Sequence, residues 1–215
     1  MSIPVSVEVA DENFLRQHSD FLKTLPKLTH FTQPEIDAIA IIYFKFLREF
    51  GVKREQMDRS QFRAFFHSTF QISDDFIIDR AFLFLDKGLT PFVTLETWIK
   101  TLSLFLRGTL EEKMKYCFFV YDLGGNGRLK RNDIIRLLRK CFIYEKDEDV
   151  ELMVKEFADI LVRKLDVDGD GEISYEDFSE SVKKQRELLQ CFGRCLPDLL
   201  STVDFMQTFT SDLPI

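Results

Sequence analysis

The sequence contains little proline, glycine or cysteine and has no long apolar run. Six prolines and nine glycines in 215 residues leave room for long helices, because these two residue types are the poorest helix formers. The longest apolar runs, such as residues 38–44, are far shorter than the ~18–20 residues of a membrane-spanning helix. A net charge of −7 disfavours nucleic-acid binding, because phosphate contacts require a basic surface. We therefore expect neither a membrane anchor nor a nucleic-acid partner.

The first residues lack a basic segment followed by an apolar core, so we expect no secretion signal. N-myristoylation requires glycine where this chain has Ser2, so we expect no such anchor. The four cysteines are too few for a disulfide scaffold and are expected to stay reduced. Cys117 and Cys141 occupy apolar positions of helical stretches and are expected to be buried. Cys191 and Cys195 lack the two further ligands that a zinc site needs.

Apolar residues recur at spacings of three and four along most of the chain, which contains 23 phenylalanines. Such spacing places apolar side chains on one face of a helix. One example is the stretch from Phe14 to Leu25, and another follows a predicted capping box of Thr32 and Glu35. No strand of more than a few residues is indicated. We therefore predict an all-α fold in which most phenylalanines fill the core.

Residues 166–177 have the spacing of an EF-hand calcium loop. Asp166, Asp168 and Asp170 supply carboxylates at positions 1, 3 and 5, and Gly171 at position 6 permits the sharp turn. The loop contains six acidic residues and no basic one, so its carboxylates would repel each other without a cation. The alternative is an acidic surface turn, but amphipathic helices flank the loop on both sides. We therefore predict that this loop binds Ca²⁺.

Three further residues complete the predicted loop. Glu172 at position 7 contributes its backbone carbonyl oxygen, and Ser174 at position 9 ligates directly or through water. Asp177 fills position 12, where Glu normally binds through both oxygens. Because Asp is one methylene shorter, we expect single-oxygen binding, weaker calcium affinity and stronger competition from Mg²⁺. The predicted metal ligands are Asp166, Asp168, Asp170, Glu172 and Asp177.

The same frame recurs at residues 122–133 with fewer ligands. Gly124 at position 3 offers no side chain. Arg128, Lys130 and Arg131 add three positive charges against two carboxylates, and this local field opposes a dication. We favour a structural turn over a calcium site for this loop. The positions that still fit the frame are Asp122, Asn126, Gly127, Leu129 and Asp133.

Two earlier frames, at residues 86–97 and 50–61, are further degraded. In residues 86–97, Pro91 replaces the turn glycine and Thr97 replaces the acid at position 12. Residues 50–61 retain no ligand at positions 1, 3 or 5. The four frames begin at residues 50, 86, 122 and 166, and each has an apolar residue at position 8. This repetition predicts helix–loop–helix units whose paired loops meet through a short two-stranded contact.

We therefore predict two lobes of paired EF-hands, with the first three loops degenerate and an extra helix before them. The expected N-terminal extension covers residues 1–31, and the first EF-hand pair covers residues 32–105. The second pair covers residues 106–190, and a C-terminal tail covers residues 191–215.

No enzyme chemistry is indicated. His18, His30 and His67 have no acid or cysteine at catalytic spacing, so packing or surface roles are favoured. The sequence contains no glycine-rich phosphate-binding loop. We therefore expect a binding protein rather than an enzyme.

Residues 98–118 (WIKTLSLFLRGTLEEKMKYCF) closely resemble the calaxin family, EF-hand proteins of ciliary axonemes related to the neuronal calcium sensors. The family's last loop also ends in Asp, in agreement with Asp177. The matching segments are residues 58–63, 86–87, 98–118, 122–123, 166–177 and 192–198, roughly residues 58–198 in all. The family's ligands are missing here at Gly88, Thr90, Pro91, Thr97 and Gly124. The resemblance therefore predicts fold and location better than calcium sensing.

The resemblance implies a calcium-responsive subunit of the outer dynein arm. Family members belong to the docking complex on doublet microtubules and modulate dynein in cilia and sperm flagella. The implied partners are outer arm dynein and the coiled-coil proteins of the docking complex. The implied location is the cytoplasm and its cytoskeleton, in the axoneme of a cilium or flagellum.

The residues leave alternative functions open. In a calcium sensor, ion binding reorients the flanking helices and exposes an apolar surface. In a calcium-independent scaffold of the axoneme, the EF-hand pairs are structural. A generic cytosolic calcium sensor or buffer is a third alternative. The candidate residues for the sensor's apolar surface are Phe157, Ile160, Leu161, Phe178 and Val182.

Overall fold

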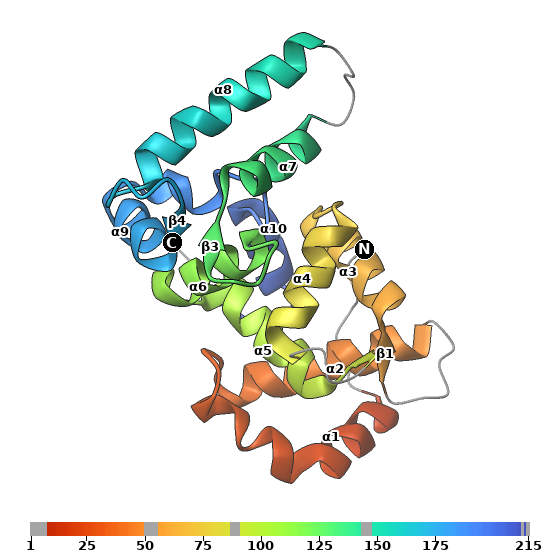
Figure 1. The fold of residues 1–215 in the computed structure, drawn as a ribbon. Helices are drawn as coiled ribbons and strands as arrows, with labels where there is room; N and C mark the ends of the chain where they lie inside the picture. Colours follow the sequence, from red (N-terminus) through yellow and green to blue (C-terminus); the bar gives the residue numbers. More distant parts are fainter. Residues whose placement is uncertain (1–7, 50–55, 87–90, 143–147, 212, 214–215) are drawn as a thin grey trace. The chain divides into compact units, whose positions relative to one another are not determined.

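The computed structural model describes residues 8–49, 56–86, 91–142, 148–211 and 213. Helices dominate these ranges, which confirms the predicted all-α fold class (Figure 1). Residues 50–55 and 87–90 of the two earliest predicted loops lie outside the described residues, as does the segment that contains Ser2. Among the described residues, no helix combines the length and the apolar character needed to cross a membrane.

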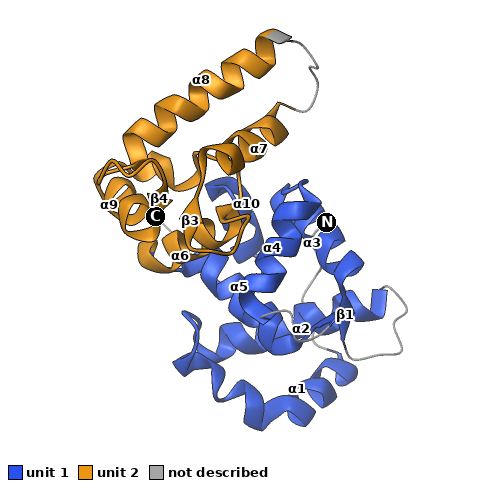
Figure 2. Ribbon diagram, viewed as in Figure 1, with its two compact units in different colours: residues 1–109, 197–215 blue, residues 110–196 orange. Residues whose placement is uncertain are grey.

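The chain divides into two compact units, which Figure 2 colours separately. Unit 1 comprises residues 1–109 and 197–215, and unit 2 comprises residues 110–196. The described elements of unit 1 are α1 (Val9–Leu22), η1 (Leu25–Lys27), α2 (Gln33–Glu49), β1 (Met57–Asp58), α3 (Arg59–Phe70), α4 (Asp75–Asp86), β2 (Phe92–Val93), α5 (Leu95–Arg107) and α10 (Leu199–Met206). Those of unit 2 are α6 (Leu110–Tyr121), β3 (Arg128–Leu129), α7 (Arg131–Cys141), α8 (Glu148–Leu165), β4 (Ile173–Ser174), α9 (Tyr175–Lys184) and η2 (Arg186–Gln190).

Within the described ranges, each unit has one short antiparallel strand pair. In unit 1, β1 pairs with β2 and places Met57 opposite Val93. In unit 2, β3 pairs with β4 and places Leu129 opposite Ile173. These four residues occupy position 8 of their frames, so the predicted contact between paired loops is confirmed. The predicted extra helix is α1, which packs against α2.

Side chains that accept hydrogen bonds from free backbone amides fix where several helices begin. At the start of α3, Asp58 accepts from the amide of Gln61 at 2.8 Å, and the Gln61 side chain accepts from the amide of Asp58 at 2.9 Å. In the first turn of α2, the Glu35 side chain accepts from the amide of Thr32 at 2.8 Å, in the predicted capping position. The reciprocal pair of Asp58 and Gln61 and the one-way contact of Glu35 with Thr32 each end a loop and start a helix within a few residues.

Unit 1 is built around an aromatic core. Phe62, Phe66, Phe70 and Trp98 each expose 1% or less of their surface. The C-terminal segment completes this core, because α10 packs against α3 and α5. The ring of Phe205 in α10 lies 5.6 Å from that of Phe70 in an edge-on arrangement, which is a favourable geometry for aromatic pairs.

The four cysteines are free thiols in unit 2. Cys117 is buried, as predicted, and its sulfur lies 3.3 Å from that of Cys195. The prediction for Cys141 is wrong, because this last residue of α7 is exposed at the helix end. Burial raises the pKa of Cys191 to about 12, so its thiol stays protonated and unreactive at neutral pH.

Candidate metal centre

The acidic loop, residues 166–177, connects α8 to α9 in unit 2 (Figure 1). The amide of Asp166 extends the hydrogen-bond pattern of α8 by donating to the carbonyl oxygen of Val162 at 2.8 Å. Toward its other end the loop forms β4 and then enters the first turn of α9. Two helices and the pairing of β4 with β3 therefore hold the loop in place.

Three of the predicted ligands converge. Carboxylate oxygens of Asp166, Asp168 and Asp170 lie within 4.8 Å of one another. Backbone amides support this arrangement: Oδ1 of Asp166 accepts from Gly169 at 2.8 Å, and its Oδ2 accepts from Gly171 at 3.0 Å. Gly171 has a φ of +88°, which side-chain-bearing residues rarely adopt, so the predicted turn is present. The converging carboxylates provide hard oxygen donors of the kind that Ca²⁺ and Mg²⁺ prefer.

Asp177 is anchored at the start of α9. Its Oδ2 accepts from the hydroxyl of Ser174 at 2.6 Å and from the amide of Ser174 at 2.9 Å. Its Oδ1 accepts from the amide of Val167 at 3.3 Å. Burial alone raises the pKa of Asp177, but these hydrogen bonds outweigh burial and lower the pKa below its ordinary value. Asp177 is therefore ionised at neutral pH. Its carboxylate lies outside the cluster formed by Asp166, Asp168 and Asp170.

The side chain of Glu172 also lies outside that cluster and contacts basic residues of the neighbouring loop instead. Its Oε1 lies 3.7 Å from Nζ of Lys130, and its Oε2 lies 3.8 Å from Nε of Arg128. Position 7 contributes a backbone carbonyl oxygen in an EF-hand, so this side chain is not needed as a ligand. The structure thus gathers the side chains of three of the five predicted ligands, and those of Glu172 and Asp177 lie outside this cluster.

Arg128 makes a contact that spacing along the sequence does not indicate. Its Nη1 donates a hydrogen bond to Oδ2 of Asp170, a predicted ligand. The other carboxylate oxygen of Asp170 accepts from the amide of Glu172 at 2.9 Å. The amide contact and then the Arg128 contact lower the pKa of Asp170. The pairing of β3 with β4, which places Arg128 opposite Ser174, is the feature that could have revealed this ion pair.

Residues 122–133 form an EF-hand-like turn that closes through its own hydrogen bonds. The carboxylate of Asp122 accepts from the amide of Gly127 at 2.8 Å and from that of Asn126 at 3.3 Å. The side chain of Asn126 accepts from the amide of Arg128 at 3.1 Å. Among the described residues, the grouping of acidic, histidine or cysteine ligands that could hold a metal lies in the acidic loop and not here.

The position-12 residue of the loop at 86–97 has a capping role. The amide of Thr97 donates to Oγ1 of Thr94 at 3.1 Å, and the two hydroxyl oxygens lie 3.0 Å apart. Thr94 is the N-cap residue of α5, so this contact starts the helix. Thr97 accordingly stabilises local structure where a calcium loop would have an acid.

The five residues expected to form the sensor's apolar surface divide into two groups. Phe157 and Ile160 of α8 are exposed, at 41% and 51% of their surface. Leu161, Phe178 and Val182 are buried in unit 2, with 5% or less exposed. The five side chains therefore do not form one exposed apolar surface in this conformation. A calcium-dependent change in its exposure stays a prediction.

Comparisons with known proteins identify the fold family. Residues 111–183 match the EF-hand domain pair. Calaxin of Xenopus laevis is 38% identical over 200 residues, which cover 91% of this chain and 95% of the relative. Calaxin of Danio rerio is 37% identical over 184 residues, covering 84% of this chain and 88% of the relative. Calaxin of Homo sapiens is 37% identical over 196 residues, covering 85% and 92%.

Proposed function

Because the chain belongs to the calaxin family of EF-hand proteins, we propose that it is a calcium-binding subunit of the outer dynein arm in cilia and flagella. In this role it belongs to the docking complex on doublet microtubules and regulates or anchors axonemal dynein. Its partners are outer arm dynein and the coiled-coil proteins of the docking complex. Its location is the axoneme, within the cytoskeleton. The family consists of EF-hand proteins and not of enzymes.

The observation that carries calcium binding is the convergence of the carboxylates of Asp166, Asp168 and Asp170 within 4.8 Å. In the proposed site, Glu172 adds its backbone carbonyl oxygen and Asp177 adds a carboxylate oxygen. A bound Ca²⁺ supplies two positive charges that offset the mutual repulsion of the acidic side chains. The short side chain of Asp177 favours single-oxygen binding and leaves Mg²⁺ as a competitor.

The ligand residues connect the site to two helices. Asp166 directly follows α8, whereas Asp177 lies in the first turn of α9 and is held there by Ser174. Drawing these two carboxylates toward a shared ion changes the geometry between α8 and α9. Because α8 also presents Phe157 and Ile160, such a change alters the apolar surface available to a partner.

A calcium-independent scaffold is the second candidate function, and the geometry of residues 122–133 favours it. Asp122 and Asn126 close this turn with backbone hydrogen bonds, so its shape is maintained by the protein itself. Both candidates keep two EF-hand pairs, over residues 32–105 and 106–190, between an extension at 1–31 and a tail at 191–215. A generic cytosolic calcium sensor would share the site but not the axonemal partners.

Calorimetric titration tests calcium binding directly. The wild type is titrated with Ca²⁺ with and without millimolar Mg²⁺, and Asp166→Ala is the matched variant. One binding event that is lost in Asp166→Ala supports the calcium site. Absence of binding heat, together with unchanged thermal unfolding when Ca²⁺ replaces a chelator, would leave the scaffold as the function.

Reconstitution tests the axonemal role. Axonemes stripped of outer arms and docking complex are incubated with docking-complex coiled-coil proteins and outer arm dynein, in the presence or absence of this protein. We expect the protein to sediment with the axonemes and to increase dynein retention. Equal dynein retention with and without the protein would contradict a docking role, whatever the calorimetry shows.

A further inference from the structure

A salt bridge joins the two loops of unit 2 at a predicted calcium ligand. Arg128 projects from loop 122–133 and donates through Nη1 to Oδ2 of Asp170. Its Nε lies 3.8 Å from Oε2 of Glu172. The guanidinium group of Arg128 therefore contacts two acidic residues of the acidic loop at residues 166–177. That loop contains six acidic residues and no basic residue of its own.

We propose that Arg128 is a built-in counter-cation of the acidic loop, which competes with Ca²⁺ for Asp170 and thereby sets the loop's calcium affinity. The inference rests on the proposed calcium binding and adds a residue outside the twelve-residue loop to its determinants. The degenerate loop then has a role of its own, since it weakens its partner's site.

Both carboxylate oxygens of Asp170 are engaged in the described conformation. Oδ1 accepts from the amide of Glu172 at 2.9 Å, and Oδ2 accepts from Arg128. An oxygen that enters the coordination sphere of a cation must exchange or share its present donor. The amide contact is internal to the loop and belongs to the turn, whereas the Arg128 contact comes from another loop. Arg128 is therefore the donor whose loss frees Asp170 without unfolding the turn.

The same ion pair has the opposite effect on the ion-free protein. Without a cation, the carboxylates of Asp166, Asp168 and Asp170 lie close together and repel one another. The positive charge of Arg128 offsets part of this repulsion. Removing Arg128 should therefore destabilise the ion-free form and tighten calcium binding. A residue that only maintains the fold would not produce these opposite signs.

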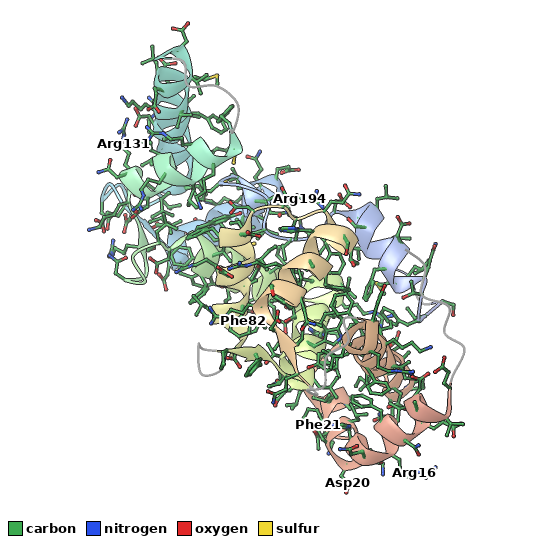
Figure 3. All side chains as sticks on the ribbon, turned by 90° about the vertical axis from the view of Figure 1, so that its right-hand side faces the viewer. Arg16, Asp20, Phe21, Phe82, Arg131 and Arg194 are labelled. Carbon is green, nitrogen blue, oxygen red and sulfur yellow. The ribbon has the colours of Figure 1, made fainter. Side chains whose placement is uncertain are left out.

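Arg131 provides a matched control in the same loop. It carries the same charge, but its Nε and Nη2 donate to the carboxylate of Asp159 in α8 at 2.5 and 3.0 Å. Its side chain lies at the surface of the protein (Figure 3). The substitution Arg131→Ala therefore removes one positive charge and one ion pair without releasing a calcium ligand.

The test compares wild type, Arg128→Ala, Arg128→Lys and Arg131→Ala by calorimetric titration with Ca²⁺ and by thermal unfolding in chelator. We expect Arg128→Ala to bind Ca²⁺ about two- to fivefold more tightly, as suits a half-exposed ion pair. In the presence of chelator, the midpoint of thermal unfolding of Arg128→Ala should be about 1–5 °C lower than that of the wild type. Arg128→Lys keeps the positive charge but cannot contact Asp170 and Glu172 through two separate nitrogen atoms. Its calcium affinity and unfolding midpoint should therefore lie between those of the wild type and those of Arg128→Ala.

Each other outcome has a definite meaning. If folded Arg128→Ala binds Ca²⁺ with unchanged or weaker affinity, the proposed role of Arg128 is wrong. The same conclusion follows if Arg131→Ala tightens calcium binding as much as Arg128→Ala does. Neither result contradicts the proposed calcium site. If Arg128→Ala does not fold, the Arg128→Lys titration decides in the same way. Absence of calcium binding in wild type and in every variant overturns the proposed calcium site itself.

Discussion

The hydroxyl group of Tyr43 donates a hydrogen bond of 2.8 Å to the carbonyl oxygen of Val93. The hydroxyl oxygen of Tyr43 in turn accepts a hydrogen bond from the amide of Met57 at 3.2 Å. Since Met57 and Val93 are paired in β1 and β2, one fully buried side chain of α2 joins both loops of unit 1. Unit 1 can therefore keep its loops paired through a protein side chain, without reliance on ions.

The substitution Tyr43→Phe should destabilise unit 1 by about 1–2 kcal/mol, because it removes one partner from two buried backbone groups without changing the packing volume. Urea unfolding followed by the fluorescence of Trp98, the single tryptophan of the chain, measures this change in unit 1. Calcium affinity serves as the control and should not change. A midpoint equal to that of the wild type would show that the hydroxyl group is dispensable.

The C-terminal helix α10 should be essential to the stability of unit 1. The ring of Phe205 is 7% exposed and lies 5.7 Å from that of Phe65. Phe205→Ala should lower the free energy of unfolding by about 3–5 kcal/mol, through lost burial and a residual cavity. Leu200→Ala on the same helix is the control, because Leu200 is 71% exposed and should change stability by no more than about 0.5 kcal/mol. Similar losses in both variants would contradict this packing.

The local features of the fold were predictable because neighbouring residues determine them. The contact between Thr32 and Glu35 needs only a spacing of three, and the acidic loop is specified by carboxylates at alternating positions and a glycine turn. The strand contacts of Met57 with Val93 and of Leu129 with Ile173 follow from the repeat, since equivalent positions of paired loops meet.

The features that the sequence did not predict are of two kinds. Some are contacts between residues that are distant in the sequence, and one depends on where a helix ends. The contact of Phe205 with Phe65 is invisible to periodicity, because an apolar helix face does not specify its partner. The ion pair of Arg128 with Asp170 requires the register of two loops and the reach of a long side chain. Cys141 fits an apolar helical position, but α7 ends there and leaves it exposed.

Calcium binding should depend on Asp166 and not on Asp122, which occupies the same position 1 in the other loop of unit 2. Asp166→Ala should abolish binding, because Asp166 supplies the first ligand and also holds the amides of Gly169 and Gly171. Asp122→Ala should leave the number of bound ions unchanged while lowering stability by about 1 kcal/mol, since it releases the amides that close the other turn. Calorimetry and urea unfolding measure the two effects. Equal losses of binding would show that residues 122–133 also hold an ion.

The substitution Asp177→Glu should strengthen calcium binding and reduce competition from Mg²⁺. The longer side chain at position 12 can bind through both oxygens, which suits the larger coordination sphere of Ca²⁺. Asp177→Asn is the control, because it retains hydrogen-bonding capacity toward Ser174 but loses the charge and should weaken binding. Titrations in the presence and absence of Mg²⁺ compare the variants. Unchanged selectivity in Asp177→Glu would mean that the position of α9, and not side-chain length, limits coordination.

The stability of unit 1 should fall in acid through one buried carboxylate. Glu35 accepts from Nη2 of Arg107 at 2.7 Å and from Nη1 at 3.1 Å. Burial alone raises the pKa of Glu35, but hydrogen bonds from the Thr32 amide, Arg107 and the hydroxyls of Thr32 and Thr210 together lower the pKa below its ordinary value of 4.5. A carboxyl group whose pKa is lower in the folded than in the unfolded state binds more protons when unfolded. Its stabilising effect is therefore present above about pH 4.5 and is lost as the pH falls below that value.

The variant Glu35→Gln isolates this effect, because it cannot ionise. It should be less stable than the wild type at pH 7, and the difference should narrow as the pH is lowered below about 4.5. Arg107→Ala should show the same narrowing, because protonation of Glu35 weakens the same ion pair in the wild type. Urea midpoints reported by Trp98 fluorescence at several pH values measure both differences. A gap between wild type and Glu35→Gln that stays constant down to pH 3 would mean that the carboxylate contributes to unit 1 as a hydrogen-bond acceptor and not as a charge.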